Sequence, residues 1–497
     1  MSPTLLHDLL DERAVRSPDA RALHRHDRTW SYRDLAERSV AAAGWLRDLG
    51  VRRGDRVVLL ARNDAEVAPL VFGISRLGAV FVLLSDQIRP YHLEHILADS
   101  APQVVLGSAA ALDRARPLVQ ATLRRLDEVP PTATTAPEAT PPCLSVDPVC
   151  LIYTSGSTAL PKAVVSTHRQ VLFAIAAIQE RLGYRPDDVV FCCLPLSFDY
   201  GLYQLFLATA GGSLLALGDD DDAGPALLRR LAATGATVLP LVPSLAAVLC
   251  RLLDRSGNVP AALRMVTNTG AELTTSTATR LRTHLPALNV VAMFGLTECK
   301  RISIAEPNLD LVRPGSVGRP LRDTEAYVVD DEGRPAPPET VGELVVRGPH
   351  VMAGYWNRPE LTAQRFRTDP FGQPLLHTGD RCRMDADGYL YFLGRDDDVY
   401  KQRGFRVSTT EIEGAAMDIP GVELAAALPP DDRHGARLAV CGDITPDRLV
   451  KELLDRLEEQ KIPAECRVVE TLPLSVNGKI DRRVLSAGWD ATDGVAE

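Results

Sequence analysis

A loop of small hydroxyl and glycine residues follows a short apolar run near residue 150. It reads YTSGSTALPK from Tyr153 to Lys162. Successive backbone N–H groups in such a loop can form a concavity that binds an anion, most often a phosphate, and lysine adds a mobile positive charge. The loop lacks the Gly-Lys-Ser/Thr triplet of a P-loop. It therefore predicts a phosphate site of another kind, with an ordinary polar turn as the structural alternative.

Lysine is scarce in this chain, so lysines in glycine-containing loops are conspicuous. Only six of the 55 basic residues are lysines. Three of them, Lys162, Lys401 and Lys479, stand in loops that contain glycine. These three lysines stand out from that background, and the structural alternative is that they are ordinary exposed loop lysines.

The size and composition are those of a globular protein with at least two domains. The chain has 497 residues, 45% hydrophobic and 24% charged, with a net charge of -10. The negative charge argues against nucleic acid or an anionic membrane as a partner, and the start of the chain does not resemble a secretory signal. Nine cysteines without C-x-x-C spacing argue against a disulfide framework or a zinc site. We expect a cytoplasmic protein.

The elements that position the loop are predicted by hydrophobic periodicity. Residues 1 to about 127 alternate helical and strand patterns, which indicates parallel strands with crossover helices. Residues 128–142 are rich in Pro and Thr and predict a surface connector. The alternation then resumes with strands at 149–154 and 163–166, which flank the loop. A helix follows, capped by Ser166 or Thr167.

Further strand candidates lie between residues 187 and 295, in DDVVFCCLPL, GSLLAL, ATVLPLVP, LRMVTNTG and LNVVAMFG. After about residue 320 the strands become short and alternating, which predicts a small antiparallel or barrel-like subdomain. The last 100 residues fit a small α+β domain. The expected fold class is therefore α/β, with a large N-terminal domain of parallel-rich αβ subdomains, a small β subdomain and a C-terminal α+β domain.

Five stretches in order resemble those of the adenylate-forming superfamily, which includes acyl-CoA synthetases and nonribosomal-peptide adenylation domains. They are Tyr153–Lys162, FGLTE at 294–298, GELVVRGPHVMAGYWNRPELT at 342–362, HTGD through GRDDDVYKQRGFRVSTTEIE at 377–413, and NGKIDR at 477–482. One such motif would be weak evidence for the resemblance, whereas five in order are strong evidence. Together they cover essentially the whole chain. The resemblance implies an AMP-forming ligase that uses ATP and Mg²⁺.

The resemblance implies an ATP site. Phe294 would stack on adenine, while Asp380 and Arg395 would bind the ribose, although an aspartate in a Thr-Gly-Asp turn is often only a turn former. The remaining residues implied to bind ATP are Thr154, Ser155, Gly156, Ser157, Thr158, Lys162 and Gly270. Family members usually have glycine at the positions of Ala159 and Ala163. If residue 159 needs a positive φ, alanine there costs about 1 kcal/mol.

The resemblance also implies the catalytic residues. Glu298 would bind Mg²⁺, with Thr297 near the α-phosphate. Lys479 would reach in from the C-terminal domain to neutralise charge during adenylation. Asp397 would be the hinge about which that domain rotates, so that Lys401 faces the site only afterwards. The implied division is an adenylation core at 1–396 and a mobile lid at 397–497.

The stretch LPLSFDYGLYQLF, residues 194–206, bears on the substrate. Amino-acid-activating members carry Phe-Asp here, and Asp199 would pair with the substrate amine, because a buried carboxylate needs a partner. A helix-capping aspartate is the structural alternative. The implied side-chain pocket comprises Tyr200, Tyr203, Thr269, Met293 and Arg301. The tyrosines favour a small or cyclic amino acid such as proline, whereas Arg301 could cancel the amine site or bind an acidic side chain.

The chain ends soon after the last motif, so we expect the thiol to be supplied in trans. The favoured hypothesis is a stand-alone amino-acid adenylation enzyme of secondary metabolism that forms acyl-AMP, releases pyrophosphate and loads a separate peptidyl or acyl carrier protein. An acyl-CoA or aryl-CoA ligase that uses coenzyme A is the second hypothesis. A non-catalytic nucleotide-binding descendant is the third.

Overall fold

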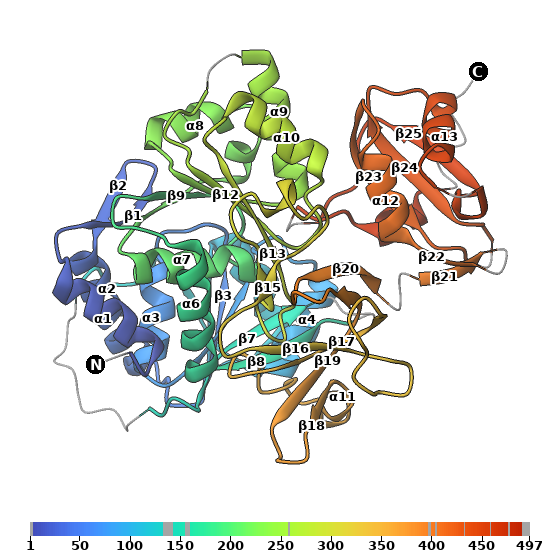
Figure 1. The fold of residues 1–497 in the computed structure, drawn as a ribbon. Coiled ribbons are helices and arrows are strands. Elements are labelled where there is room, and N and C mark those ends of the chain that lie inside the picture. Colours follow the sequence, from blue (N-terminus) through green and yellow to red (C-terminus); the bar gives the residue numbers. More distant parts are fainter. Residues whose placement is uncertain are drawn as a thin grey trace.

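The computed structural model describes residues 3–132, 143–154, 160–256, 259–395, 399–402, 405–431, 433–457, 459–475 and 478–489. Two large sheets and a small antiparallel sheet form the body of the molecule, and the C-terminal elements form a separate unit beside it (Figure 1). The α/β class expected from the sequence is confirmed. None of the described helices is long and apolar enough to cross a membrane.

The larger sheet is parallel at its centre and antiparallel at its edges. Its described strands, in spatial order, are β15 (Arg319–Pro320), β14 (Ser303–Ile304), β13 (Asn289–Phe294), β12 (Met265–Asn268), β11 (Val238–Leu241), β9 (Val189–Cys192), β10 (Leu214–Leu217), β1 (Arg21–Arg25) and β2 (Arg28–Ser31). The five strand candidates between 187 and 295 are β9 to β13, all in the parallel part.

The second large sheet carries the phosphate-loop motif at one edge. Its strands, in spatial order, are β6 (Thr122–Arg125), β5 (Val104–Gly107), β3 (Arg56–Leu60), β4 (Val80–Leu84), β7 (Pro148–Thr154) and β8 (Lys162–Thr167). β7 and β8 are antiparallel, with Thr154 opposite Lys162. The two strands expected around the loop are therefore present, and the loop connects the ends of one hairpin.

Helices cover both sheets. Those that lie between the two sheets or line the N-terminal side are α1 (Leu6–Arg16), α2 (Tyr32–Asp48), α3 (Val67–Arg76), α6 (His168–Leu182) and α7 (Asp199–Gly211). The others of this region are α4 (Pro90–Ser100), α5 (Ala109–Ala115), α8 (Leu227–Thr234), α9 (Pro243–Ser256) and α10 (Thr275–His284). Thr167 caps α6 and accepts a hydrogen bond from the Gln170 amide, as expected.

Strand periodicity explains how one sheet serves two cores. Val57 and Leu59 of β3 belong to the largest apolar cluster, which also contains α2, α3, α6, α7 and the larger sheet. Val58 and Leu60 belong to a second cluster on the opposite face, with α4 and α5. Alternate residues of a strand point to opposite faces, so both faces of this sheet are buried.

The small sheet is antiparallel and contains the strands expected after residue 320. They are β16 (Glu325–Val329), β17 (Val341–Arg347), β19 (Pro374–Met384), β18 (Phe366–Thr368) and β20 (Leu390–Arg395), with α11 (Pro359–Arg365) beside them. The residues between β17 and α11 also pair with β8, through an isolated bridge between Val164 and Tyr355. This pairing joins the small sheet to the strand that begins at Lys162.

The C-terminal unit has its own sheet and its own apolar clusters. Its elements are β21 (Val399–Gln402), β22 (Phe405–Ser408), α12 (Thr409–Met417), β23 (Val422–Leu428), β24 (Arg437–Gly442), α13 (Pro446–Leu454), β25 (Glu465–Val469) and α14 (Arg482–Ala487). Among the described residues, two hydrogen bonds join it to α9. Arg251 donates to Glu423 at 2.7 Å, and the Ser244 hydroxyl donates to the Gly478 carbonyl at 2.8 Å.

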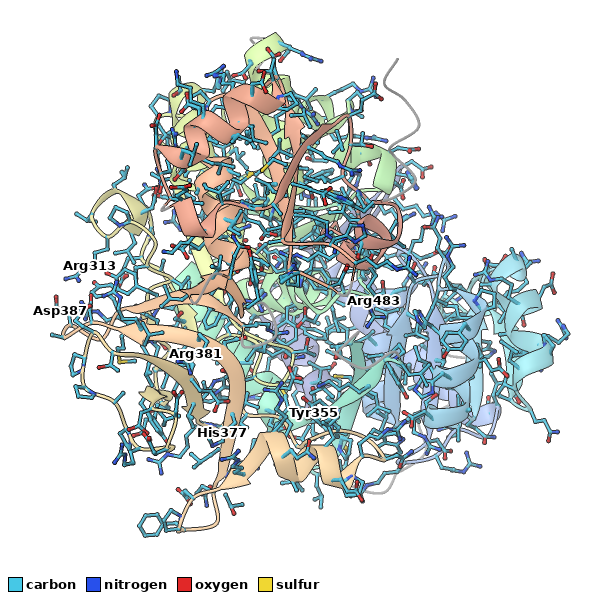
Figure 2. All side chains as sticks on the ribbon, turned by 90° about the vertical axis from the view of Figure 1, so that its right-hand side faces the viewer. Arg313, Tyr355, His377, Arg381, Asp387 and Arg483 are labelled. Atoms are coloured by element: carbon cyan, nitrogen blue, oxygen red, sulfur yellow. The ribbon has the colours of Figure 1, made fainter. Side chains whose placement is uncertain are left out.

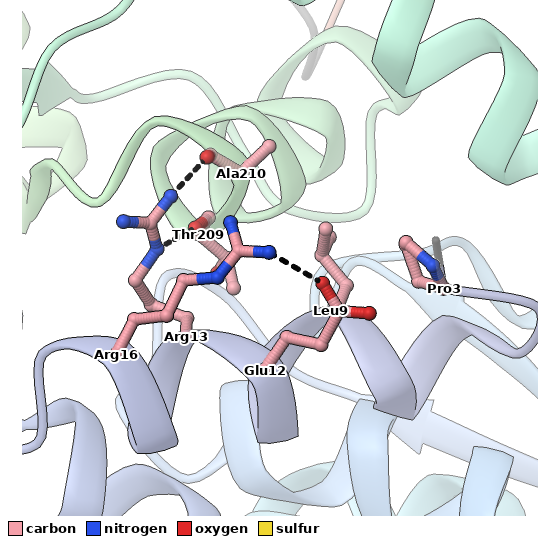
Figure 3. A pocket seen from close by; sticks show the side chains of 7 residues that line it. All are labelled: Pro3, Leu9, Glu12, Arg13, Arg16, Thr209 and Ala210. Atoms are coloured by element: carbon pink, nitrogen blue, oxygen red, sulfur yellow. Dashed lines mark hydrogen bonds and ion pairs between the residues drawn. The ribbon is translucent and has the colours of Figure 1, made fainter. Parts of the chain in front are cut away.

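The N-terminal helix holds the far end of α7. Arg13 donates to the carbonyls of Thr209 and Ala210, where a cation complements the dipole of the helix (Figure 3). A shallow hollow lies beside this contact. A helix of this length spans about 20 Å, so the hollow lies far from Asp199 at the other end. The contact therefore fixes the helix that carries Asp199 without belonging to the candidate site.

Candidate active site

The candidate site begins where parallel strands of the larger sheet end. Thr269 and Gly270 directly follow β12, and the residues from Gly295 to Glu298 directly follow the neighbouring β13. Ligands of α/β proteins commonly bind outside the carboxyl ends of adjacent parallel strands. This topology brings Thr269, Gly270, Thr297 and Glu298 to one end of the parallel strands.

The turn after β13 depends on close backbone approach. A Cβ at Gly295 would lie 2.0 Å from the Lys300 carbonyl oxygen, so only glycine fits. Lys300 itself has a φ of 62°, in the left-handed region. Glu298 and Lys300 are only two positions apart in the sequence. Because of the tight turn, their side chains lie in different parts of the site.

Lys300 lies in the acid end of the site, a name we use for Asp199, Tyr203, Lys300 and Arg301. Its side chain is 1% exposed, and its Nζ lies 3.9 Å from Asp199 Oδ2 and 5.6 Å from the centroid of the Tyr203 ring. Among the described residues Nζ has no hydrogen-bond partner, and neither has the buried Tyr203 hydroxyl. Burial lowers the pKa of Lys300, while Asp199 acts in the opposite direction.

The other residues expected in the substrate pocket lie close by, and the contacts below are with the protein itself. The Tyr200 hydroxyl donates to the Thr267 carbonyl at 2.7 Å, which ties α7 to β12. The Arg301 guanidinium lies 5.2 Å from the centroid of the Tyr200 ring and donates to the Lys300 carbonyl. Met293 is buried in β13. Asp199 is the first residue of α7, but Phe198 is the N-cap and α7 has no side-chain cap hydrogen bond, so the structure does not support the capping interpretation.

Lys479 reaches the site from the C-terminal unit. Its Nζ lies 5.2 Å from the centroid of the Phe198 ring, and its Cε would be 2.9 Å from a Cβ placed on Gly270. Gly270 has a φ of 90° and leaves room for the lysine stem. Lys479 as a whole residue is nevertheless exposed to solvent. Desolvation lowers the pKa of Lys479, Asp199 raises it, and Arg395 and Arg301 lower it further.

The phosphate end of the site consists of Lys162, Glu298 and Tyr355. Lys162 Nζ donates to the Tyr355 hydroxyl at 2.8 Å, and this hydroxyl donates to Glu298 Oε1 at 2.6 Å. Lys162 Nζ is 3.7 Å from the same carboxylate oxygen. Burial lowers the pKa of Lys162, although Glu298 raises it. The cation and the carboxylate are therefore bridged by one phenol.

The residues expected to bind the nucleoside lie in and beside the small sheet. Asp380 and Arg395 are opposite each other in β19 and β20, and Arg395 Nε donates to Asp380 Oδ1 at 2.9 Å. Asp380 is 1% exposed, and this burial raises the pKa of its carboxyl to about 6 despite Arg395. The Phe294 ring packs against Phe392 with centroids 5.2 Å apart.

Some predicted residues are not described by the structure. Ser155, Gly156, Ser157, Thr158 and the variant position Ala159 lie outside the described residues, as does the hinge Asp397. Lys401 lies in β21, and its side chain is not described. The domain boundary at 396/397 therefore stays a prediction. Ala163 pairs regularly with Tyr153 in the core of the sheet, so alanine fits that position.

Sequence reasoning missed Tyr355 and Lys300. Tyr355 lies inside the GELVVRGPHVMAGYWNRPELT motif, which supported the resemblance but yielded no site residue. Lys300 is one of the six lysines, yet it does not stand in a glycine-rich loop as the other three do. Lys300 and Asp199 are far apart in the sequence, and the turn at Gly295 brings them together, which residue spacing does not reveal.

The phosphate end fits Mg²⁺ bound together with a nucleotide. Within the described residues, no group of three or more His, Cys, Asp or Glu side chains could hold a metal ion by itself. Mg²⁺ is commonly bound by one or two carboxylates together with substrate phosphates. The Glu298 carboxylate, beside the end of the phosphate loop, provides one hard oxygen ligand of this type.

A family model described as AMP-binding enzyme matches residues 10–356. The chain belongs to the AMP-binding enzyme family. The adenylate-forming superfamily expected from the five motifs, and with it the class of AMP-forming ligase, is confirmed. Among curated proteins, bacitracin synthase 3 of Bacillus licheniformis is 31% identical over 493 residues. This match covers 96% of the present chain but only 8% of the synthase.

Two solved structures extend the comparison. VinN is 40% identical, with a TM-score of 0.73, and the match covers 78% of this chain and 98% of VinN. The anthranilate CoA ligase AuaEII has a TM-score of 0.90 at 24% identity and covers 99% of this chain and 98% of the ligase. The second match shows the fold through both the large body and the C-terminal unit.

Proposed function

We propose that this AMP-binding enzyme activates an amino acid that carries a second carboxylate, such as aspartate. The products of the first step are the aminoacyl adenylate and pyrophosphate. The acyl group is then transferred to a thiol. A separate carrier protein is the preferred thiol donor, and coenzyme A is the alternative.

The observation that carries this proposal is the charge at the acid end. Asp199 provides one carboxylate, whereas Lys300, Arg301 and Lys479 place three cationic groups near it. A substrate ammonium can pair with Asp199 only if another anion balances the buried Lys300. Buried charges without a partner are unfavourable, so a second substrate carboxylate next to Lys300 is the simplest counter-ion.

The relatives support the same substrate class. VinN, whose match covers almost its whole length, has been solved in a complex with L-aspartate, at 39% identity and a TM-score of 0.72. The curated relative bacitracin synthase 3 is a peptide synthase by name. A proline-like substrate, which the tyrosines alone favour, would bring its amine to the Asp199 carboxylate that already pairs with Lys300 at 3.9 Å and would supply no further anion. We therefore expect it to be a poor substrate.

The chemistry requires charge neutralisation more than proton transfer. A carboxylate oxygen of the substrate forms a bond to the α-phosphorus, the bond to the bridging oxygen of the β-phosphate breaks, and pyrophosphate leaves with the electron pair. Both reactants are anionic, so catalysis depends on positioning and on nearby cations. Lys479 is the cation that lies between the acid end and the nucleotide residues.

The ATP side uses the large body of the molecule. Lys162, at the end of the phosphate loop, binds the β- and γ-phosphates, and Asp380 with Arg395 binds the ribose. Mg²⁺, held by Glu298, neutralises phosphate charge when bound. Thr297, beside Glu298, contacts the α-phosphate.

Residues 397–497 act as a lid in this proposal. Lys479 serves the adenylation step. Rotation about Asp397 then replaces it with the loop that contains Lys401 for thiol transfer. The contact of Lys479 with Gly270 and Phe198 supports the first of these two arrangements.

The test is ATP–pyrophosphate exchange with a panel of L-aspartate, L-glutamate, L-asparagine, L-proline, succinate and octanoate. We expect exchange with an acidic amino acid and little with asparagine or succinate, which lack the second carboxylate and the amine respectively. Preferred exchange with proline or octanoate would contradict the substrate class. Exchange with none of a wide range of acids would favour the non-catalytic hypothesis.

The variant Lys300→Met tests the observation directly. It keeps an unbranched side chain of similar length and removes the charge, so kcat/KM for the acidic substrate should fall about 100-fold, while the asparagine background falls much less. Lys451→Met is a matched control, because Lys451 is exposed on α13. Equal losses for charged and uncharged substrates would mean that Lys300 only supports the fold. Offering coenzyme A and a phosphopantetheinylated carrier in parallel identifies the thiol.

A further inference from the structure

The segment before α11 is fixed to the strand that begins at Lys162. Residues 353–356 run antiparallel to β8, with hydrogen bonds from Val165 to the Gly354 carbonyl at 2.9 Å and from Trp356 to the Ala163 carbonyl at 2.9 Å. Met352 donates to the Glu298 carbonyl at 2.9 Å. One short segment therefore contacts both the phosphate-loop strand and the turn that carries Glu298.

Packing fixes the ring of Tyr355. The residue is 6% exposed, and its ring meets Phe366 edge-on, with centroids 5.4 Å apart. Its backbone amide donates to the Thr362 hydroxyl at 2.9 Å. Figure 2 shows Tyr355 beside the tan helix α11. Packing within the protein therefore fixes the orientation of the phenol without a bound ligand.

The hydroxyl of Tyr355 separates two groups of opposite charge. It accepts from Lys162 Nζ at 2.8 Å and donates to Glu298 Oε1 at 2.6 Å, while these two charged atoms remain 3.7 Å apart. The Lys162 ammonium also lies 4.1 Å from the centroid of the Tyr355 ring. Removing the hydroxyl would remove the group that bridges the ammonium and the carboxylate.

We propose that Tyr355 is a positioning residue that holds the Lys162–Glu298 ion pair at 3.7 Å and keeps the ammonium from donating a direct hydrogen bond to the carboxylate. Lys162 then stays available to phosphate oxygens, and the Glu298 carboxylate stays available to Mg²⁺. This inference rests on the proposed roles of Lys162 and Glu298 in binding ATP with Mg²⁺. The Lys162 ammonium and Mg²⁺ would compete for the Glu298 carboxylate. The inference is that the Tyr355 hydroxyl weakens the competing ammonium contact.

The test is the variant Tyr355→Phe, which keeps the ring, its contact with Phe366 and its face toward Lys162. Binding of the non-hydrolysable analogue α,β-methylene-ATP is measured by calorimetry across a wide range of Mg²⁺ concentration. A lost hydrogen bond shifts equilibria by about 2- to 13-fold, so we expect the Mg²⁺ concentration for half-maximal binding to rise about fivefold. The KM for MgATP should rise in parallel, and the KM for the amino acid should not.

Tyr389→Phe is the matched control. Tyr389 is also buried, and its hydroxyl accepts from Arg319 at 2.8 Å, outside the candidate site. Its Mg²⁺ dependence should equal that of the parent protein.

The double variant Lys162→Met/Tyr355→Phe separates positioning from a purely structural role. Removing the competing ammonium should return its Mg²⁺ dependence to that of Lys162→Met alone. An unchanged Mg²⁺ dependence in Tyr355→Phe, or a further shift in the double variant, would overturn the inference. If Glu298→Gln and Lys162→Met also leave binding unchanged, the proposed ATP site itself is wrong, and thermal unfolding of each variant identifies any that fail to fold.

Discussion

At the phosphate end of the site, the ammonium of Lys162 and the carboxylate of Glu298 share the hydroxyl of Tyr355. At the acid end, the ammonium of Lys300 is more deeply buried, yet it has no hydrogen-bond partner among the described residues and lies 3.9 Å from Asp199. Both ends contain one lysine and one carboxylate, but among the described residues only the lysine of the first end has a hydrogen-bond partner.

The difference indicates where specificity resides. A hydrogen-bonded cluster of this kind can form before its ligand binds, which suits the ATP that we propose as the ligand. An unsatisfied buried cation instead favours a ligand that provides the missing anion and disfavours one that cannot, because an unpaired buried group costs more than a good pair gains. The acid end should therefore discriminate between substrates, and the phosphate end should not.

Removal of the lysine that lies between the two ends should have the largest effect. In Lys479→Ala, pyrophosphate exchange should fall about 10²- to 10³-fold, since one preorganised charge-stabilising group is lost. Transfer from preformed aminoacyl adenylate to a thiol should change much less. Single-turnover measurements of the two steps check this. Loss of thioester formation with normal adenylation would reverse the assigned role.

The comparison becomes sharper if a residue proposed to bind the nucleoside is changed without affecting the acid end. Asp380→Asn should raise the KM for ATP about tenfold, as expected for a lost charged hydrogen-bond acceptor, and leave the KM for the amino acid unchanged. A rise in both KM values would show that the two ends are not separable.

The same aspartate predicts a pH dependence. Its pKa in the folded chain is raised from 3.8 to about 6, so protonation below about pH 6 would remove the acceptor that we propose for the ribose hydroxyls. ATP affinity should fall as pH falls through 6, and Asp380→Asn should lack this step. Protonation of this group stabilises the fold between the two pKa values, so weaker binding there would not reflect unfolding. Calorimetric titration of ATP from pH 7.5 to 5, a range chosen to span that pKa of about 6, checks this.

The smallest effect is expected at the contact between the large body and the C-terminal unit. Arg251 and Glu423 form a partly exposed pair at 2.7 Å, and such pairs contribute about 0.2 to 1 kcal/mol. Arg251→Ala should slow adenylation by less than about fivefold, and the exchanged pair Arg251→Glu/Glu423→Arg should recover most of the loss. The control is Arg280→Ala, which breaks the pair with Asp254 within the large body. Equal losses in both variants would argue against a role in placing Lys479.

Local pattern determined much of the fold and the phosphate end. The hairpin of β7 and β8 follows from two apolar runs around a loop of small residues, and the Thr167 cap follows from its position before a helical pattern. Thr154, Lys162 and Glu298 occupy ordered motifs, so their grouping at the strand ends could be predicted. These features depend on the apolar pattern and turn residues of short segments, which can be recognised in the sequence.

The tertiary structure alone decided the acid end and the role of Tyr355. Lys300 approaches Asp199 because Gly295 permits a turn that no side chain could accommodate, and Tyr355 reaches Lys162 because a segment almost 200 residues later in the chain pairs with β8 (355 - 162 = 193). Residue types and spacing do not contain such distances. They arise when strands distant in sequence become neighbours, and only then can a buried charge be recognised as paired or unpaired.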